Sequence, residues 1–341
     1  MPVKKPQITQ VQPAAAIPGG EFQIRGSGLA SGDRPPRVLF GDTVAPILVG
    51  SDTLVIARVP EGAGMGPLVV EADHERSSPW MCEIGIQMAD ALHPVASPAV
   101  DAQGNVYTTF SGSRGQKTPV SVYRVDANMN LKPYVSDLMN ASGLAFDREG
   151  LLYVSSRFDG VVYQVTGKGE MSVYVEGMGV ATGIAFDAEE NLYVGDRAGT
   201  IFKVSRTRQI YVFATIEQSI AAYHLALGPD GYLYVTGPTT SSFDAVQRIS
   251  PAGEVEIFYR GLGRPQGLAF DADGRLYVAG SMGGRRGIVR IDAAGKAEMF
   301  VSGPNIVGLA FGHGGYLYIT TTGGLYRMSS GVRGAAMPNL A

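Results

Sequence analysis

The sequence has little of several features that mark whole classes of protein. It contains one cysteine, Cys82, in 341 residues, which excludes an intramolecular disulfide and a cysteine-rich zinc site. No apolar run approaches the roughly 20 residues that a membrane-spanning helix needs. The 28 basic and 31 acidic residues give a net charge of −3. Without a surplus of Lys and Arg, nucleic acid is not an expected partner.

A signal-peptide pattern is also missing at the N-terminus. Lys4 and Lys5 are not followed by the apolar stretch that such a peptide requires. We therefore expect a cytoplasmic location for the chain as given, and a secreted one only if a leader segment has been removed.

Glycine, by contrast, is abundant. The 46 glycines are about twice the share expected from the ~7% background. Charged residues make up only 17% of the chain, and no helical periodicity stands out. This composition predicts an all-β protein with many turns.

A pattern of the form D-x-x-G-x-L-Y, or a close variant, recurs six times. Its copies end at Tyr107, Tyr153, Tyr193, Tyr234, Tyr277 and Tyr318. A small apolar run such as 143–146 precedes the pattern, and alternating segments such as 161–165 and 171–175 follow it. The pattern predicts a strand, a tight turn with glycine at positive φ, and three further strands. Four strands in about 42 residues are one blade of a β-propeller, so six copies predict six blades within residues 86–341. We expect the repeated tyrosines to pack between blades.

Residues 1–85 lack this period. Short alternating segments at 19–28, 37–41, 47–49, 53–60 and 67–72 predict a small immunoglobulin-like β-sandwich. The sixth blade has no clear fourth strand after residue 329. Residues 81–86 are one candidate to close the ring, and the alternative is that they only end the first domain.

The first segment resembles an IPT/TIG domain. The similarity rests on Ile8-x-x-Val-x-Pro13, Pro18-Gly-Gly20, Ile24-x-Gly-x-Gly-Leu29, Val38-x-Phe-Gly41 and Ala57-x-Val-Pro60. The repeated G-[LI]-A-F-D-x-x-G-x-L-Y-V units resemble the NHL-repeat and SMP-30/gluconolactonase-like six-bladed propellers. That resemblance implies the propeller fold. It leaves function open, because those families include calcium-dependent lactonases, other hydrolases, lyases and propellers that only bind partners.

Strand direction predicts where a ligand site lies. Residues just before each inner strand, and those just after the next strand, fall at one end of the propeller, its mouth. Aligning the repeats predicts a ring of six residues at this mouth: Ala96, Ser142, Thr182, Tyr223, Gln266 and Val307. His224 lies one position deeper, and Arg157, Asp196 and Arg197 form a second tier. Outer loops add the charged residues Arg114, Lys117, Asp159, Glu176, Glu217, Asp244, Arg264, Arg285 and Arg286.

The lactonase resemblance implies a divalent ion held at this mouth by Glu, Asn and Asp side chains from separate blades. Here the E-G-P motif of the lactonases is replaced by Ala96-Ser-Pro98, and the predicted ring contains no carboxylate. Calcium prefers six to eight oxygen ligands that include carboxylates. We therefore expect no metal and no cofactor, and calcium or another divalent ion only if the protein is a hydrolase.

Two functions remain open. In the first, the protein is a binding module whose mouth holds a small polar or anionic ligand, or a loop of a partner protein. The binding residues would be Ser142, Thr182, Tyr223, His224, Gln266, Arg157, Asp196 and Arg197. Arg157 and Arg197 either clamp an anion or pair with the nearby Asp159 and Asp196. In the second, it is a gluconolactonase-like hydrolase of a lactone or ester, with no catalytic residue assigned. Ligand identity, oligomeric state and interdomain angle do not follow from the sequence.

Overall fold

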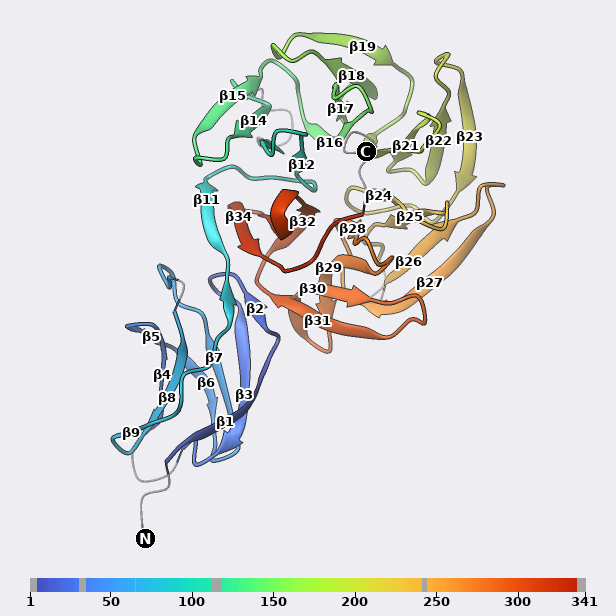
Figure 1. Cartoon of the computed structure of the whole chain (residues 1–341). Helices are drawn as coiled ribbons and strands as arrows, with labels where there is room; N and C mark the ends of the chain where they lie inside the picture. Colours follow the sequence, from blue (N-terminus) through green and yellow to red (C-terminus); the bar gives the residue numbers. More distant parts are fainter. Residues whose placement is uncertain (1–4, 31–34, 65, 112–117, 241–243, 336–341) are drawn as a thin grey trace. The chain divides into compact units, whose positions relative to one another are not determined.

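The computed structural model describes residues 5–30, 35–64, 66–111, 118–240 and 244–335. The chain divides into two compact units (Figure 1). One comprises Met1–Ile86, Arg285–Val289 and Glu298–Pro304, and the other comprises Gln87–Gly284, Arg290–Ala297 and Asn305–Ala341. The described residues form strands and one 3₁₀ turn, η1 (His313–Gly315), so the all-β prediction is confirmed. Across these ranges, no helix has the length and apolar character to cross a membrane.

The first unit contains a β-sandwich of two four-stranded sheets with orders β1-β3-β7-β6 and β5-β4-β8-β9. The strands of the first sheet are β1 (Gln7–Gln12), β3 (Glu21–Ser27), β7 (Leu54–Arg58) and β6 (Ile47–Gly50). Those of the second are β5 (Thr43–Ala45), β4 (Arg37–Phe40), β8 (Leu68–Ala72) and β9 (Glu75–Arg76).

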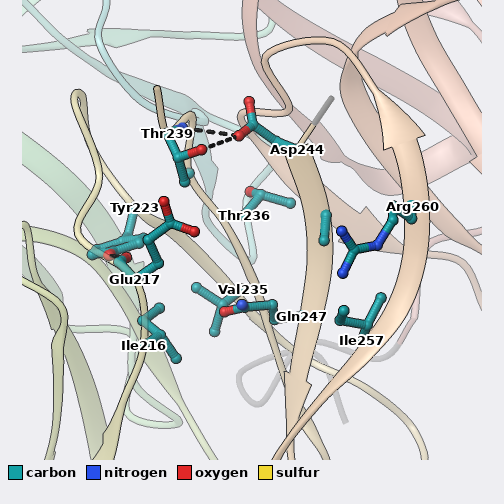
Figure 2. Close-up of a pocket in the computed structure, with 12 residues that line it drawn as sticks. Ile216, Glu217, Tyr223, Val235, Thr236, Thr239, Asp244, Gln247, Ile257 and Arg260 are labelled. Carbon is teal, nitrogen blue, oxygen red and sulfur yellow. Dashed lines mark hydrogen bonds between the residues drawn. The ribbon is translucent and has the colours of Figure 1, made fainter. Parts of the chain in front are cut away.

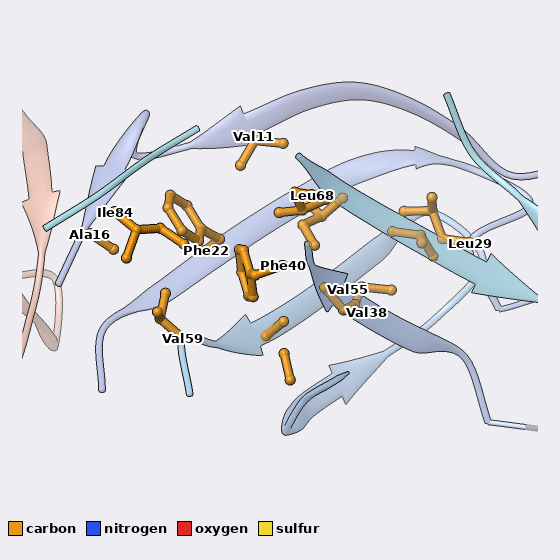
Figure 3. Close-up of a cluster of buried hydrophobic side chains, with 14 residues drawn as sticks. Val11, Ala16, Phe22, Leu29, Val38, Phe40, Val55, Val59, Leu68 and Ile84 are labelled. Atoms are coloured by element: carbon orange, nitrogen blue, oxygen red, sulfur yellow. The ribbon is translucent and has the colours of Figure 1, made fainter. Parts of the chain in front are cut away.

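The sandwich core follows from alternation along these strands. Phe22 and Ile24 of β3 are fully buried, and Val38 and Phe40 of β4 are at most 1% exposed. The residue between each pair is less buried, as alternation along a strand predicts. The rings of Phe22 and Phe40 lie 5.6 Å apart between centroids, so the two sheets pack directly on each other (Figure 3).

Two short strands, β2 (Ala15–Ala16) and β10 (Glu83–Ile84), lie outside these two sheets. They pair in parallel with each other, and β2 also pairs in parallel with Val301–Ser302. The backbone N–H of Ile17 donates to the Ser302 carbonyl at 3.0 Å, and Ser302 Oγ accepts from the N–H of Glu21 at 2.8 Å. The first unit thus includes these residues, although they lie more than 200 positions further along the chain.

Six blades of four strands each form the propeller, as the repeats predict (Figure 1). Blade one consists of β12 (Ala99–Val100), β13 (Val106–Thr109), β14 (Val122–Val125) and β15 (Leu131–Val135). Blade two consists of β16 (Ala141–Phe146), β17 (Leu152–Ser156), β18 (Val161–Val165) and β19 (Met171–Val175). Blade three consists of β20 (Ala181–Phe186), β21 (Leu192–Asp196), β22 (Thr200–Val204) and β23 (Ile210–Thr215). Blades four and five are β24 (His224–Leu227), β25 (Leu233–Thr236), β26 (Asp244–Ile249) and β27 (Val255–Leu262), then β28 (Leu268–Phe270), β29 (Leu276–Met282), β30 (Arg285–Ile291) and β31 (Ala297–Ser302).

The sixth blade corrects one expectation from the sequence. It consists of β32 (Ile306–Phe311), β33 (Tyr316–Thr321), β34 (Gly324–Ser329) and β11 (Ile86–Asp90), in the order β11-β34-β33-β32. A segment from before blade one therefore closes the ring. However, the closing strand is 86–90 rather than 81–86, because Glu83–Ile84 is already paired with β2.

The turn between the first two strands of each blade has the expected conformation. Gly104, Gly150, Gly231 and Gly274 have φ near +80°, which glycine adopts without steric cost. Blade three has Glu190 at this position, with φ of 65°. Oδ1 of Asp187, in the same turn, accepts hydrogen bonds from the N–H groups of Glu189 and Asn191 at 3.0 and 2.8 Å. In blades one, two, three and five the first Asp of the repeat accepts a backbone N–H of the turn in this way, so a carboxylate stabilises the turn there.

Candidate functional site at the mouth of the propeller

The mouth end is defined by the starts of the first strands and the ends of the second strands. Two hydrogen bonds show that these segments meet. The N–H of Arg157 donates to the Asn140 carbonyl at 3.3 Å, and the N–H of Arg197 donates to the Val180 carbonyl at 3.1 Å. The repeat alignment therefore places the predicted second tier beside the predicted ring.

Most of the predicted ring residues are buried. Ser142, Thr182 and Tyr223 are 1–2% exposed, and Gln266 is partly exposed. The hydroxyl of Thr182 donates to the Gly195 carbonyl at 2.8 Å and accepts the N–H of Tyr223 at 3.1 Å. The Tyr223 hydroxyl donates to the Glu217 carbonyl. Both hydroxyls are thus used inside the protein, and their contact with a ligand stays a prediction.

The backbones of neighbouring blades approach closely at this ring. A Cβ on Gly183 would lie 2.5 Å from the Tyr223 carbonyl oxygen, and one on Gly308 would lie 2.3 Å from Ser97 Cα. Only glycine fits at such positions. The ring is therefore a contact layer between blades, with backbone carbonyls held at fixed positions.

His224 begins β24 at a position where blades two, three, five and six have glycine. Its side chain is 6% exposed. Burial lowers the pKa of His224 from 6.5 to about 4, because the protein interior disfavours the charged imidazolium. At neutral pH this histidine is therefore an uncharged imidazole.

Arg157 and Arg197 occupy equivalent positions at the mouth ends of blades two and three. Burial, and then the positive charge of Arg197, lower the pKa of Arg157. Nη2 of Arg157 donates to Ser111 Oγ at 2.9 Å, so the side chain reaches across to blade one. Arg197 is exposed. In the described part of the chain, neither guanidinium forms an ion pair with a carboxylate.

Asp196 does not neutralise these arginines. It is buried, and its Oδ1 accepts the N–H groups of Val180 and Ala198 at 2.9 and 3.1 Å. Asp159 is occupied elsewhere, because its Oδ2 accepts the Tyr163 hydroxyl at 2.8 Å. Both carboxylates have local partners, and neither pairs with Arg157 or Arg197 in the described part of the chain.

A calcium site does not fit the residues of the mouth. Within the described ranges, no group of three or more His, Cys, Asp or Glu side chains is arranged to hold a metal ion. The ring offers hydroxyls, one amide and backbone carbonyls, and the nearby Asp196 oxygen already accepts two hydrogen bonds. Hard cations are held in proteins mainly by carboxylate-rich oxygen sets, so the donor groups of the mouth do not suit calcium.

The sequence missed one residue of this site. Ser111 lies four positions after Tyr107, where blades two and three have Arg157 and Arg197. The spacing of the repeats therefore pointed to position 111, although a serine at that position gives no chemical reason to select it. Arg114 and Lys117, expected in an outer loop, lie outside the described residues.

Comparison with known proteins separates the two parts of the chain. Residues 6–79 match the IPT/TIG domain family. They form an IPT/TIG domain. No curated protein sequence matches the chain, so likeness for the rest comes from solved structures. The IPT/TIG domain is an immunoglobulin-like sandwich, in agreement with the two packed sheets described above.

Three solved structures illustrate the fold. A protein assigned as a gluconolactonase covers 74% of this chain and 94% of its own at 19% identity, with a TM-score of 0.62. An auxiliary nutrient binding protein from Bacteroides thetaiotaomicron covers 96% and 99% at 13% identity, with a TM-score of 0.56. Virginiamycin B lyase from Staphylococcus aureus covers 70% and 80% at 17% identity, with a TM-score of 0.52. The chain is thus similar in fold to propellers that bind and propellers that catalyse.

Proposed function

We propose that the protein is a binding protein that holds a small anionic molecule at the mouth of the propeller, through Arg157 and Arg197. The observation that carries this proposal is that two arginines at equivalent positions of neighbouring blades lack a carboxylate partner among the described residues. Burial first, and then the positive charge of Arg197, lowers the pKa of Arg157. A bound anion would counter that positive charge and accept hydrogen bonds from both forks.

The surroundings support an anion of more than one charge. Arg157 is held by Ser111 from blade one, and Arg197 extends from blade three, so the two donors approach from different blades. Backbone carbonyls and neutral hydroxyls fill the ring below them. A rigid, uncharged ring beneath two cations suits a di- or tricarboxylate or a phosphate ester better than a neutral ligand.

Hydrolysis remains the less supported function. Its support is the similarity in fold to the protein assigned as a gluconolactonase, and fold alone does not carry an activity. The mouth residues give no carboxylate cluster for a metal within the described ranges. The similarity to an auxiliary nutrient binding protein over 96% of the chain agrees with a binding role.

Calorimetric titration of the full chain with acetate, succinate, citrate and inorganic phosphate tests the proposal. We expect citrate or phosphate to bind more tightly than acetate, and binding to weaken as salt rises. Arg157→Gln and Arg197→Gln should each weaken binding by about tenfold or more, which is about 1.4 kcal/mol. Arg148→Gln removes a positive charge at the opposite end of blade two and should leave affinity unchanged. Equal losses in all three variants, or no loss in any, would refute the assignment.

A further inference from the structure

A cavity lies between blades three and four, and neither Arg157 nor Arg197 lines it. Its volume is about 110 Å³, compared with roughly 10–15 Å³ for a single water molecule on the same measure. It is lined by the segment after β23, by the residue before β24 and by β25, β26 and β27 (Figure 2). The residues that matter for its chemistry are Glu217, Tyr223, Asp244, Gln247 and Arg260.

Asp244 places a buried negative charge at this cavity. The residue is 3% exposed. Its Oδ1 accepts the N–H and the hydroxyl of Thr239 at 3.0 and 2.7 Å. Its Oδ2 has no hydrogen-bond partner among the described residues. A buried carboxylate oxygen without a donor is costly, so the wall around it favours a positively charged donor nearby.

Glu217 and Arg260 face the same space from opposite sides. Figure 2 shows the Glu217 carboxylate extending from the blade-three side and the Arg260 guanidinium extending from β27, with the Gln247 amide between them. No ion pair joins either group to another described residue. Glu217 and Arg260 thus place opposite charges on opposite sides of the cavity, whereas Asp244 lies on β26, the strand next to that of Arg260. Such an arrangement fits a ligand that carries a cation at one end and an anion at the other.

We propose that this cavity binds a small zwitterion of the α-amino-acid type. The ammonium group lies towards the Glu217 carboxylate, on the side of the cavity that Tyr223 also lines. The carboxylate lies towards Arg260, which offers a planar fork of donors, and Gln247 supplies a further hydrogen bond. Ile216, Val235 and Ile257 form the apolar lining and suit a short aliphatic side chain. This site does not depend on the arginine pair at the mouth.

Saturation-transfer NMR titration of the full chain with L-alanine, propionate and ethylamine tests this inference. Propionate lacks the ammonium and ethylamine lacks the carboxylate, while all three share the short apolar group. We expect L-alanine to bind at least about tenfold more tightly than either. Glu217→Gln and Arg260→Gln each remove one charge that faces the ligand, and each should weaken L-alanine binding about fivefold or more. Arg148→Gln removes a positive charge on blade two that does not line the cavity, and as the control it should leave L-alanine binding unchanged.

Three results would overturn the proposal. Absence of L-alanine binding would show that the cavity takes no such zwitterion. Ethylamine binding as tightly as L-alanine would make this a cation site only. Loss of L-alanine binding in Arg157→Gln with none in Glu217→Gln would place the ligand at the mouth. Failure of citrate and phosphate to bind at the mouth bears on the arginine pair alone, so the two proposals fail separately.

Discussion

Tyr277 shows how one repeated residue stabilises two blades. It is fully buried, and its ring packs edge-on to Phe311 of the next blade with centroids 5.0 Å apart. Its hydroxyl donates to Asp271 Oδ2 at 2.9 Å, within its own blade. Burial is the main cause that raises the pKa of Tyr277 to about 12, so it stays a neutral donor. The expectation that these tyrosines pack between blades is confirmed.

His224 should make stability depend on pH in a defined window. Its pKa is about 4 in the folded protein, against about 6.5 in the unfolded chain. The unfolded state therefore binds more protons between these values, and stability falls as pH drops from 6.5 towards 4. Between pH 7 and 4.5 the loss is about 2–3 kcal/mol from this residue.

Urea unfolding of the native chain and of His224→Gln at both pH values checks this. The difference in unfolding free energy between the two proteins should change by that amount, because glutamine does not titrate. If both proteins lose the same stability on acidification, His224 is not responsible.

At the scale of elements, hydroxyls two positions after the repeated tyrosine join alternate blades. Ser155, Thr236 and Thr320 occupy this position in blades two, four and six. They donate to the carbonyls of Thr182, Gln266 and Ala96, each a ring residue of the next blade. The ring residues are thus held through their backbone, which explains how unlike side chains occupy equivalent positions.

Thr320→Val tests this link with little change in shape. Thr320 is fully buried, and its hydroxyl lies 2.8 Å from the Ala96 carbonyl oxygen. Valine leaves that carbonyl without its donor, so the unfolding free energy should fall by about 1–3 kcal/mol. Thr207→Val, in an exposed turn, should change it by less than about 0.5 kcal/mol. Equal effects of the two substitutions, measured by urea unfolding, would contradict the interpretation.

The sequence predicted strands best where the repeat was regular. β18 (Val161–Val165) and β19 (Met171–Val175) begin and end where alternation predicts. β26 begins at Asp244, two residues before the alternation that starts at Val246, because pairing of Asp244 with Leu262 of β27 extends the strand beyond its apolar pattern. Alternation reports which face is buried, whereas strand ends depend on the partner strand, which no local pattern contains.

At the scale of the whole molecule, one candidate site follows from the regular repeat and the other does not. Arg157 and Arg197 were found because they occupy equivalent positions in two repeats. The cavity between blades three and four was not found, because Glu217, Asp244 and Arg260 occupy unrelated positions in their repeats. Glu217 and Asp244 appeared only as charges of outer loops. Their convergence depends on how two blades pack, which the repeat period does not specify.

The sequence offered a segment before blade one as a candidate to close the ring, but it did not give the right residues, for a related reason. Both 81–86 and 86–90 are short segments just before blade one, and only long-range pairing distinguishes them. Met88 of β11 is 8% exposed and packs with Val100, Val106 and Leu325, whereas Met81 is 75% exposed. Met88 of β11 and Leu325 of β34 share this apolar cluster, so the strand before blade one and the last strand of blade six contribute to one core.

Met88→Ala should therefore destabilise the propeller, and Met81→Ala should not. Truncating a buried methionine removes apolar contacts and leaves a cavity, so we expect a loss of about 2–4 kcal/mol in unfolding free energy. The exposed Met81 should contribute less than about 0.5 kcal/mol. Urea unfolding followed by circular dichroism measures both. The reverse order of effects would return closure to residues 81–86. A large loss at Met88 alone would show that a propeller edge is stabilised by apolar packing across the two ends of its chain as well as by strand pairing.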